Sequence, residues 1–107
     1  MSNRQRFENK VVIVTGAAQG IGHGVALQVA SEGAQVVMAD LSPYVEEVLA
    51  EIEATGGDAI TVKANLETFA GAQSVVEKAL ETYGRVDVLI NNVGGAIWMK
   101  PFEEFSE

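Results

Sequence analysis

The chain has 107 residues, 48% of them apolar, with 15 acidic and 7 basic residues, a net charge of −8 and no cysteine. This length is typical of one domain, and the apolar content is enough for a buried core. The absence of cysteine excludes disulfides and thiolate metal sites, and the net negative charge with scattered Lys and Arg argues against a nucleic-acid-binding surface. No apolar run reaches the roughly 18 residues of a membrane span, and no apolar segment follows the first basic residues as in a secretory signal, so we expect a cytoplasmic protein.

The predicted elements alternate between short strands and amphipathic helices. In chain order they are a strand at 11–14, a helix from about 21 to 33, a strand at 35–39, a helix from 42 to about 56, a strand at 59–64, a helix from about 68 to 84 and a strand at 86–90. The strand runs are apolar almost throughout, as in parallel strands buried on both faces. The order β-α-β-α-β-α-β predicts an α/β fold with a Rossmann-type doubly wound parallel sheet, truncated after the fourth strand. We expect residues 1–107 to form the N-terminal part of a single domain.

Capping residues mark the ends of these helices. Ser42 suits the N-cap of the second helix, and Pro43 suits its first helical position. Each helix runs into a glycine that is able to take the left-handed conformation of a helix end: Gly33, Gly56 and Gly84. The fourth strand is central in a complete sheet of this type. In a sheet that ended there its backbone groups would be unpaired, so we expect an exposed edge, with either marginal stability or a further chain segment or second chain packed against it.

Glycines cluster where the first strand passes into the first helix. Gly16, Gly20, Gly22 and Gly24 lie within the segment VVIVTGAAQGIGHG. The first N–H groups of a helix lack intrahelical partners, and the helix dipole adds positive charge, so a pyrophosphate fits there when no side chain blocks its approach. Taken alone, the loop is a weak signal, and the alternative is a tight strand-to-helix turn that binds nothing.

An acidic residue follows the second strand. Asp40 comes 24 residues after Gly16, a position from which a carboxylate can accept hydrogen bonds from an adenosine ribose. It would repel a 2′-phosphate by about 1–4 kcal/mol at about 4 Å. Residues 17–19 and residue 41 offer no Arg or Lys to offset that repulsion. The loop and the acid together predict a dinucleotide, with NAD favoured over NADP.

Two motifs resemble the short-chain dehydrogenase/reductase family. The segment TGAAQGIG at 15–22 resembles that family's cofactor loop, and NNVG at 91–94 resembles its Asn-Asn-Ala-Gly motif with valine in place of alanine. The resemblance covers essentially the whole chain, as the N-terminal half of a family member. It implies an NAD-dependent oxidoreductase without metal ligands, whose cofactor-binding residues are Gly16, Gln19, Gly20, Ile21, Gly22, Asp40, Asn65, Leu66, Asn92, Val93 and Gly94.

The resemblance also implies separate roles for these residues. The glycine loop surrounds the pyrophosphate, Asp40 holds the ribose, residues 92–94 lie along the cofactor, and Asn91 helps to lock the central strands. Asn65 and Leu66 stand where the family has an Asp and an apolar residue beside the adenine. An Asn can still accept from the adenine amino group through its side-chain carbonyl.

A finer resemblance lies in the segments RFENKVVIVTGAAQGIG and DVLINNVGGAIWMKPFE. They are similar to dehydrogenases that oxidise the cis-diol carboxylates formed from benzoate-type acids. This implies a dihydroxycyclohexadiene carboxylate and NAD as substrates, catechol, CO2 and NADH as products, and a homo-oligomer. Trp98 and Lys100 would then lie on the substrate side, over the ring and near its carboxylate. The alternative is a packing Trp and a solvated Lys.

The catalytic residues that the resemblance implies are a Ser and a Tyr-x-x-x-Lys pair. Tyr44 is followed four residues later by Val48, and Tyr83 by Asp87. We therefore expect a cofactor half-site without catalytic residues. A standalone non-catalytic dinucleotide-binding or interaction module and a short-chain dehydrogenase acting on another alcohol are the open alternatives. An S-adenosylmethionine methyltransferase also uses a glycine loop and an acid, but the two motifs together argue against it.

Overall fold

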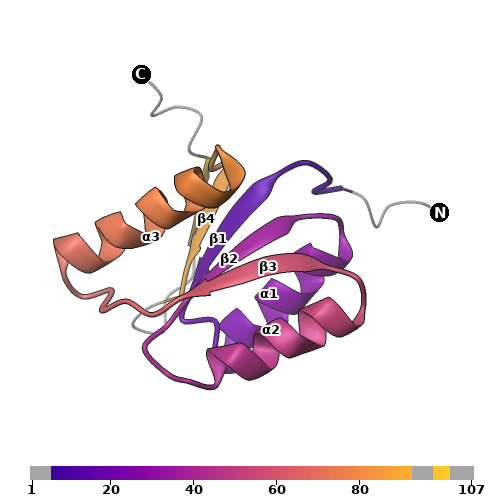
Figure 1. The fold of residues 1–107 in the computed structure, drawn as a ribbon, viewed down its shortest axis with the longest axis horizontal. Coiled ribbons are helices and arrows are strands. Elements are labelled where there is room, and N and C mark those ends of the chain that lie inside the picture. Colours follow the sequence, from indigo (N-terminus) through magenta and orange to yellow (C-terminus); the bar gives the residue numbers. More distant parts are fainter. Residues whose placement is uncertain (1–5, 93–97, 102–107) are drawn as a thin grey trace.

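Five strands form a single sheet in the computed structural model, which describes residues 6–92 and 98–101. The elements are β1 Val11–Thr15, α1 Gly20–Ser31, β2 Gln35–Ala39, α2 Val45–Ala54, β3 Asp58–Val62, α3 Phe69–Tyr83, β4 Val88–Asn91 and β5 Trp98–Pro101 (Figure 1). The order across the sheet is β3-β2-β1-β4-β5, and the first four strands are parallel. The predicted α/β fold is thus confirmed. Over the described ranges, no helix combines the length and the apolar character needed to cross a membrane.

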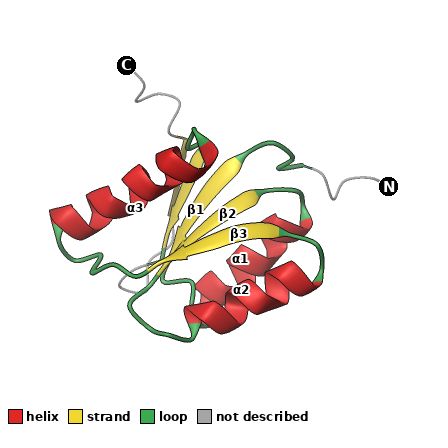
Figure 2. Ribbon diagram, viewed as in Figure 1, coloured by secondary structure: helices red, strands yellow, loops and turns green. Residues whose placement is uncertain are grey.

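Helices cover both faces of this sheet. Figure 2 shows α1 and α2 together on one face and α3 on the other. Successive side chains of β1 point to opposite faces, so Val12 and Val14 pack into the core under α1 and α2, whereas Val11 and Ile13 pack into the core under α3. These four side chains are fully buried, and burial of each stabilises the fold by about 1.5–3 kcal/mol. β1 is therefore the rigid base from which the glycine loop starts.

The helix ends agree with the sequence prediction, but one helix start does not. The three helix-terminating glycines all take positive φ, at Gly33, Gly56 and Gly84. The predictions of Ser42 as the N-cap and of Pro43 as the first helical position are wrong, because α2 begins at Val45. Ser42 opens a tight turn instead: its Oγ accepts from the Tyr44 N–H at 3.2 Å, and its carbonyl accepts from the Val45 N–H at 3.2 Å.

Strand pairing sets strand bounds slightly different from the predicted ones. β3 spans Asp58–Val62 rather than 59–64, since it pairs with β2 from Gln35 to Ala39 and ends where β2 ends. β4 spans Val88–Asn91 rather than 86–90. The apolar runs alone could not fix these limits, because the ladder of hydrogen bonds defines them.

The prediction that β4 is an exposed edge is also wrong. β5 pairs with it in antiparallel fashion, with Asn91 opposite Trp98 and Val88 opposite Pro101. β4 therefore lies between β1 and β5, and its backbone has a strand on each side. An antiparallel strand needs only a short connection, which the chain supplies between β4 and β5. Marginal stability stays a prediction.

A buried carboxylate joins two strands at the amino end of the sheet, where the parallel strands begin. Asp87 is 8% exposed. Its Oδ2 accepts from the Val11 N–H at 2.8 Å, and the Arg85 guanidinium donates to both carboxylate oxygens, at 2.8 and 2.7 Å. Burial by itself would raise the pKa of Asp87, but the hydrogen bonds from Arg85 and Val11 and the charges of Arg85 and Lys10 together lower that pKa. The charged form of Asp87 thus stabilises this end.

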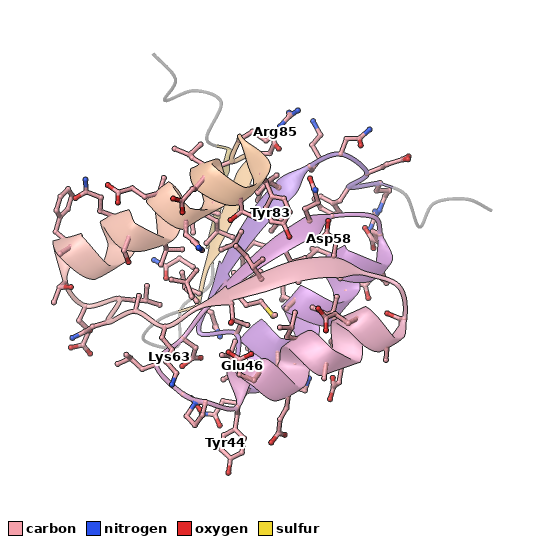
Figure 3. The ribbon with its side chains drawn as sticks, viewed as in Figure 1. Tyr44, Glu46, Asp58, Lys63, Tyr83 and Arg85 are labelled. Atoms are coloured by element: carbon pink, nitrogen blue, oxygen red, sulfur yellow. The ribbon has the colours of Figure 1, made fainter. Side chains whose placement is uncertain are left out.

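A second polar link at the amino end joins α3 to β3. The Tyr83 hydroxyl donates to Asp58 Oδ1 at 2.9 Å, and Gln35 Nε2 donates to Asp58 Oδ2 at 3.3 Å. Figure 3 shows Tyr83, Asp58 and Arg85 on this side of the molecule, away from Lys63 and Tyr44. Burial, followed by the hydrogen bond and charge of Asp58, raises the pKa of Tyr83 well above its usual value. The polar side chains at the amino end of the sheet therefore hydrogen-bond to one another.

Candidate functional site

A cavity of about 480 Å³ lies at the carboxyl end of the sheet, where the parallel strands terminate. Its lining residues follow β1, β2, β3 and β4, and they are Gly16, Gln19, Gly20, Ile21, Asp40, Leu41, Ala64, Asn65, Leu66, Glu67 and Asn92. Ligands of open α/β sheets bind at this end, at the point where the chain crosses to the other face. β1 and β4 border that point, because α1 and α3 lie on opposite faces (Figure 1). We call this space the carboxyl-end cavity.

The loop between β1 and α1 depends on glycine at three positions. Gly16 and Gly20 both have φ of 64°, a conformation that residues with a side chain rarely adopt. A Cβ at Gly22 would lie 2.1 Å from the Gly16 carbonyl oxygen and 2.8 Å from Asn92 Nδ2. Gly22 therefore packs beneath the loop rather than lining the cavity. Gly24 is different, since a Cβ there would meet nothing within 4 Å.

The N-terminus of α1 opens into this cavity without a cap. Its N-cap residue, Gln19, makes no side-chain capping hydrogen bond, and the first turn contains no acidic residue. α3 differs, because Thr68 Oγ1 accepts from the Gly71 N–H at 2.9 Å. The first N–H groups of α1 and the positive end of its dipole are thus available to an anion, whereas part of this capacity is used internally in α3.

Asp40 is held in place by two backbone donors. The Ala18 N–H donates to Oδ2 at 3.0 Å, and the Ser42 N–H donates to Oδ1 at 2.9 Å. These bonds join the glycine loop, the end of β2 and the turn before α2. Each carboxylate oxygen can accept a further hydrogen bond, and Asp40 lines the cavity. The site thus contains an oriented carboxylate with spare acceptor capacity.

Thr15 ties the ends of β1 and β4 together. Its hydroxyl donates to Asn91 Oδ1 at 2.8 Å and accepts from the Asn92 N–H at 2.9 Å. This is the locking role that the resemblance implies for Asn91, with Thr15 as its partner. The sequence analysis missed Thr15, although a polar residue that ends an otherwise apolar strand was a usable signal.

The structure brings most of the predicted site residues together. Of the eleven, the eight that line the cavity are Gly16, Gln19, Gly20, Ile21, Asp40, Asn65, Leu66 and Asn92. Gly22 supports the loop from beneath. Val93 and Gly94 lie outside the described residues, as do the side chains of Trp98 and Lys100. Leu41, Ala64 and Glu67 line the cavity but were not predicted, although each is next in sequence to a residue that was.

A second cavity of about 510 Å³ lies on the opposite face, between the sheet and α3. Its lining is mostly apolar and includes Phe69, which is 82% exposed. No oriented acid or glycine loop borders it. Within residues 6–92, no group of three or more His, Cys, Asp or Glu side chains is arranged to hold a metal ion. Of these two cavities, the carboxyl-end cavity is therefore the one suited to a charged ligand.

The comparison with known proteins agrees with this geometry. The family model described as short chain dehydrogenase matches residues 10–107. The chain belongs to the short-chain dehydrogenase family, whose members are oxidoreductases.

Similarity to particular relatives is high. The chain is 65% identical over all its 107 residues to the 1,6-dihydroxycyclohexa-2,4-diene-1-carboxylate dehydrogenase of Acinetobacter baylyi, and covers 41% of that protein. It is 48% identical over 96% of its length to the enzyme of the same name from Pseudomonas putida, covering 38% of it. A solved structure of a short-chain dehydrogenase/reductase from Burkholderia phymatum, in complex with NAD, is also similar, with a TM-score of 0.75 and 32% sequence identity. The match covers 78% of the present chain and 30% of the Burkholderia chain. The chain thus spans about two fifths of the length of these curated relatives.

Proposed function

We propose that this chain is the NAD-binding part of an oxidoreductase that converts a cis-dihydrodiol carboxylate into catechol, CO2 and NADH. The observation that supports NAD as the cofactor is that the uncapped N-terminus of α1 faces the same cavity as the oriented Asp40 carboxylate. The proposed substrate rests on the relatives named as 1,6-dihydroxycyclohexa-2,4-diene-1-carboxylate dehydrogenases, at 65% and 48% identity. A homo-oligomer is part of the proposal, and sedimentation of the purified protein tests it.

The proposed pyrophosphate position is at the glycine loop, beside the N-terminus of α1. The cavity wall has no Lys or Arg, so the N–H groups of the first turn of α1 and its dipole supply the attraction. Gly22 allows α1 to approach the loop closely, and the positive φ of Gly16 and Gly20 turns the backbone around the space where the phosphates would lie.

Asp40 is proposed to select NAD over NADP. Its two backbone hydrogen bonds keep the carboxylate oriented before any ligand arrives, so ribose hydroxyls would find acceptors already in place. A 2′-phosphate would meet repulsion of about 1–4 kcal/mol at about 4 Å. Lys63, which follows β3 and is labelled in Figure 3, is not among the residues that line the cavity.

Bound NAD would supply the hydride acceptor for oxidation of the secondary alcohol carbon of the substrate. Loss of the carboxylate as CO2 then leaves an aromatic catechol. One catechol, one CO2 and the hydride carried by NADH account for every atom of the diol carboxylate. The described residues contribute by binding and orientation, because the N-terminus of α1 at Gly20 would hold the pyrophosphate and Asp40 would hold the adenosine ribose.

Titration of the purified protein with NADH and NADPH, followed by nicotinamide fluorescence, tests the cofactor proposal. We expect NADH to bind at least about tenfold more tightly, and Asp40→Ala to reduce this ratio about tenfold by removing the repulsion. Glu53→Ala, an exposed acid on α2, is the matched control and leaves the ratio unchanged. Equal affinity for NADPH in the unmutated protein would contradict the assignment.

Turnover tests the substrate. With the cis-diol carboxylate and NAD, the enzyme carrying this sequence is expected to release equal amounts of NADH and CO2. Binding of NADH without turnover of this acid or any other alcohol favours the non-catalytic module, an alternative kept open by the absence of a Tyr-x-x-x-Lys pair from the 107 residues. NADH formation from another alcohol only would identify a different short-chain dehydrogenase.

A further inference from the structure

The first turn of α1, beside the proposed pyrophosphate position, has few side chains to keep it in place. Gly20 and Gly22 carry no side chain, and Ile21 is 59% exposed. Gly24 follows in the next turn, and each glycine inside a helix lowers the stability of that helix relative to alanine. The helix start also lacks a side-chain cap. The position of this turn relative to the rest of the cavity therefore depends on contacts made by other residues.

His23 makes such a contact at the end of this turn. Its Nε2 lies 3.0 Å from Oε1 of Glu51, which belongs to the neighbouring helix α2. The two helices lie side by side on one face of the sheet (Figure 2). An ionised carboxylate only accepts hydrogen bonds, so the His23 Nε2–H is the donor. Because α1 contains no Asp, Glu, Lys or Arg, His23 is the residue through which a charged side chain of α2 holds the start of α1.

Glu51 is a firm anchor for this bond, because α2 is packed into the core. Val48 and Ile52, which come before and after Glu51 in the sequence, are 2% and 1% exposed. α2 also follows closely on the turn that orients Asp40, in which the Ser42 N–H donates to Asp40 Oδ1 at 2.9 Å. The bond between the two helices thus connects the pyrophosphate side of the cavity to the ribose side.

We propose that His23 is a positioning residue, whose hydrogen bond to Glu51 keeps the N-terminus of α1 aligned with Asp40 so that one ligand reaches both. The inference rests on the proposed dinucleotide function, in which the pyrophosphate lies at α1 and the adenosine ribose lies at Asp40. His23 itself touches neither cofactor nor substrate in this account. Its effect is therefore confined to ligands that span both positions.

A purely electrostatic effect of Glu51 would have the opposite sign. Glu51 is 52% exposed, and its negative charge repels an anion at the start of α1, so removal of the charge alone would strengthen binding of that anion. Loss of the hydrogen bond would weaken binding instead. Glu47→Ala is the matched control, because it removes an exposed acid from the same helix and leaves the bond between His23 and Glu51 intact.

The test compares the affinities of the purified protein for ADP and for adenosine, measured by isothermal titration calorimetry. ADP spans the proposed pyrophosphate and ribose positions, whereas adenosine reaches only the ribose position. The ratio of the two affinities therefore reports on the alignment of α1 with Asp40, and a general loss of stability affects both ligands alike.

An exposed pair of this kind changes an equilibrium by a factor of about two to five. We expect His23→Ala and Glu51→Ala each to lower the ratio of ADP to adenosine affinity about threefold, and the double variant to lower it no further. Glu51→Gln should keep the ratio, because its side-chain oxygen accepts the same bond. Glu47→Ala should not lower it.

An unchanged ratio in His23→Ala, or an increased ratio in Glu51→Ala, overturns the inference. So does a double variant whose loss is the product of the two single losses, because the two residues would then act independently. If NADH does not bind, or if Asp40→Ala leaves the NADH to NADPH ratio unchanged, the proposed function itself fails. An effect of Asp40→Ala without an effect of His23→Ala overturns this inference alone.

Discussion

The two ends of the parallel sheet treat their carboxylates in opposite ways. At the amino end, Asp87 is buried, and both of its oxygens are occupied by Val11 and Arg85. At the carboxyl end, Asp40 is oriented by two backbone N–H groups but lies in a cavity and can accept more. The hydrogen-bonding capacity of Asp87 is therefore used within the fold, whereas Asp40 keeps acceptor capacity for a ligand.

The N-termini of α1 and α3, which lie at the carboxyl end of the sheet, show a similar contrast between a group used within the fold and one left for a ligand. α3 begins with a capping threonine, Thr68, and α1 begins with Gln19, which caps nothing. A missing cap costs about 0.5–2 kcal/mol of stability. α2 also lacks a side-chain cap, but its first turn carries Glu46 and Glu47. α1, which faces the cavity, has neither a cap nor an acid in its first turn, and this is the pattern expected of an anion site.

The largest effect is expected from Gly22→Ala. Its methyl group would meet the Gly16 carbonyl at 2.1 Å, so the loop and α1 must separate. We expect a cost of about 1–3 kcal/mol in stability, and a ten- to hundredfold loss of NADH affinity. Gly24→Ala is the matched control, because the added methyl is in open space. Normal binding by the Gly22 variant would contradict this account of the loop.

Asp87→Asn is expected to affect stability alone. The variant loses charge-assisted bonds from Arg85, which we expect to cost about 1–3 kcal/mol in urea denaturation at pH 7, with NADH affinity unchanged below the transition. Because the pKa of Asp87 is lowered in the folded state, its contribution is present above the unfolded value of about 3.9 and disappears as the pH falls through the folded value. The variant should therefore lose less stability in acid than the unmutated protein does. Equal acid sensitivity would count against the role of Asp87.

Gln19→Asp would give α1 the cap that α3 already has. We expect the free protein to gain about 0.5–1 kcal/mol in stability. NADH affinity should fall about tenfold, because the carboxylate competes for the N–H groups and repels the pyrophosphate. Thermal melting and NADH titration of the same sample measure both effects. A stabilised variant with unchanged NADH affinity would place the phosphates elsewhere.

The smallest effect is expected from Tyr83→Phe. Loss of the hydrogen bond to Asp58 should cost about 0.5–1.5 kcal/mol at neutral pH. The pKa of Tyr83 is raised in the folded state, so its contribution is present below the unfolded value of about 10 and is lost as the pH rises above it. Melting curves between pH 8 and 11 should show a shallower alkaline decline for the variant. An equally steep alkaline decline of the melting temperature in both proteins would contradict this role of Tyr83.

The sequence predicted the features that are encoded locally. Runs of β-branched residues, terminating glycines and the position of Asp40 each depend on a few neighbouring residues, and the strand order follows from right-handed crossovers. It could not predict β5, whose pairing with β4 has no signature in four residues. Nor could it predict that the amide of Asn65 is turned by the Glu67 N–H, or that Ser42 opens a turn bonded to Asp40, because these depend on three-dimensional arrangement of the backbone.

The most direct test of the central claim is an amide chemical-shift map of the protein during titration with NADH. If the dinucleotide binds across the carboxyl end of the sheet, the amide signals of residues 20–22, Ala18 and Asn92 should shift most, and those of Val11 and Asp87 at the amino end should stay in place. Shifts confined to the apolar cavity beside α3, around Val75 and Phe69, or to the amino end would contradict the account.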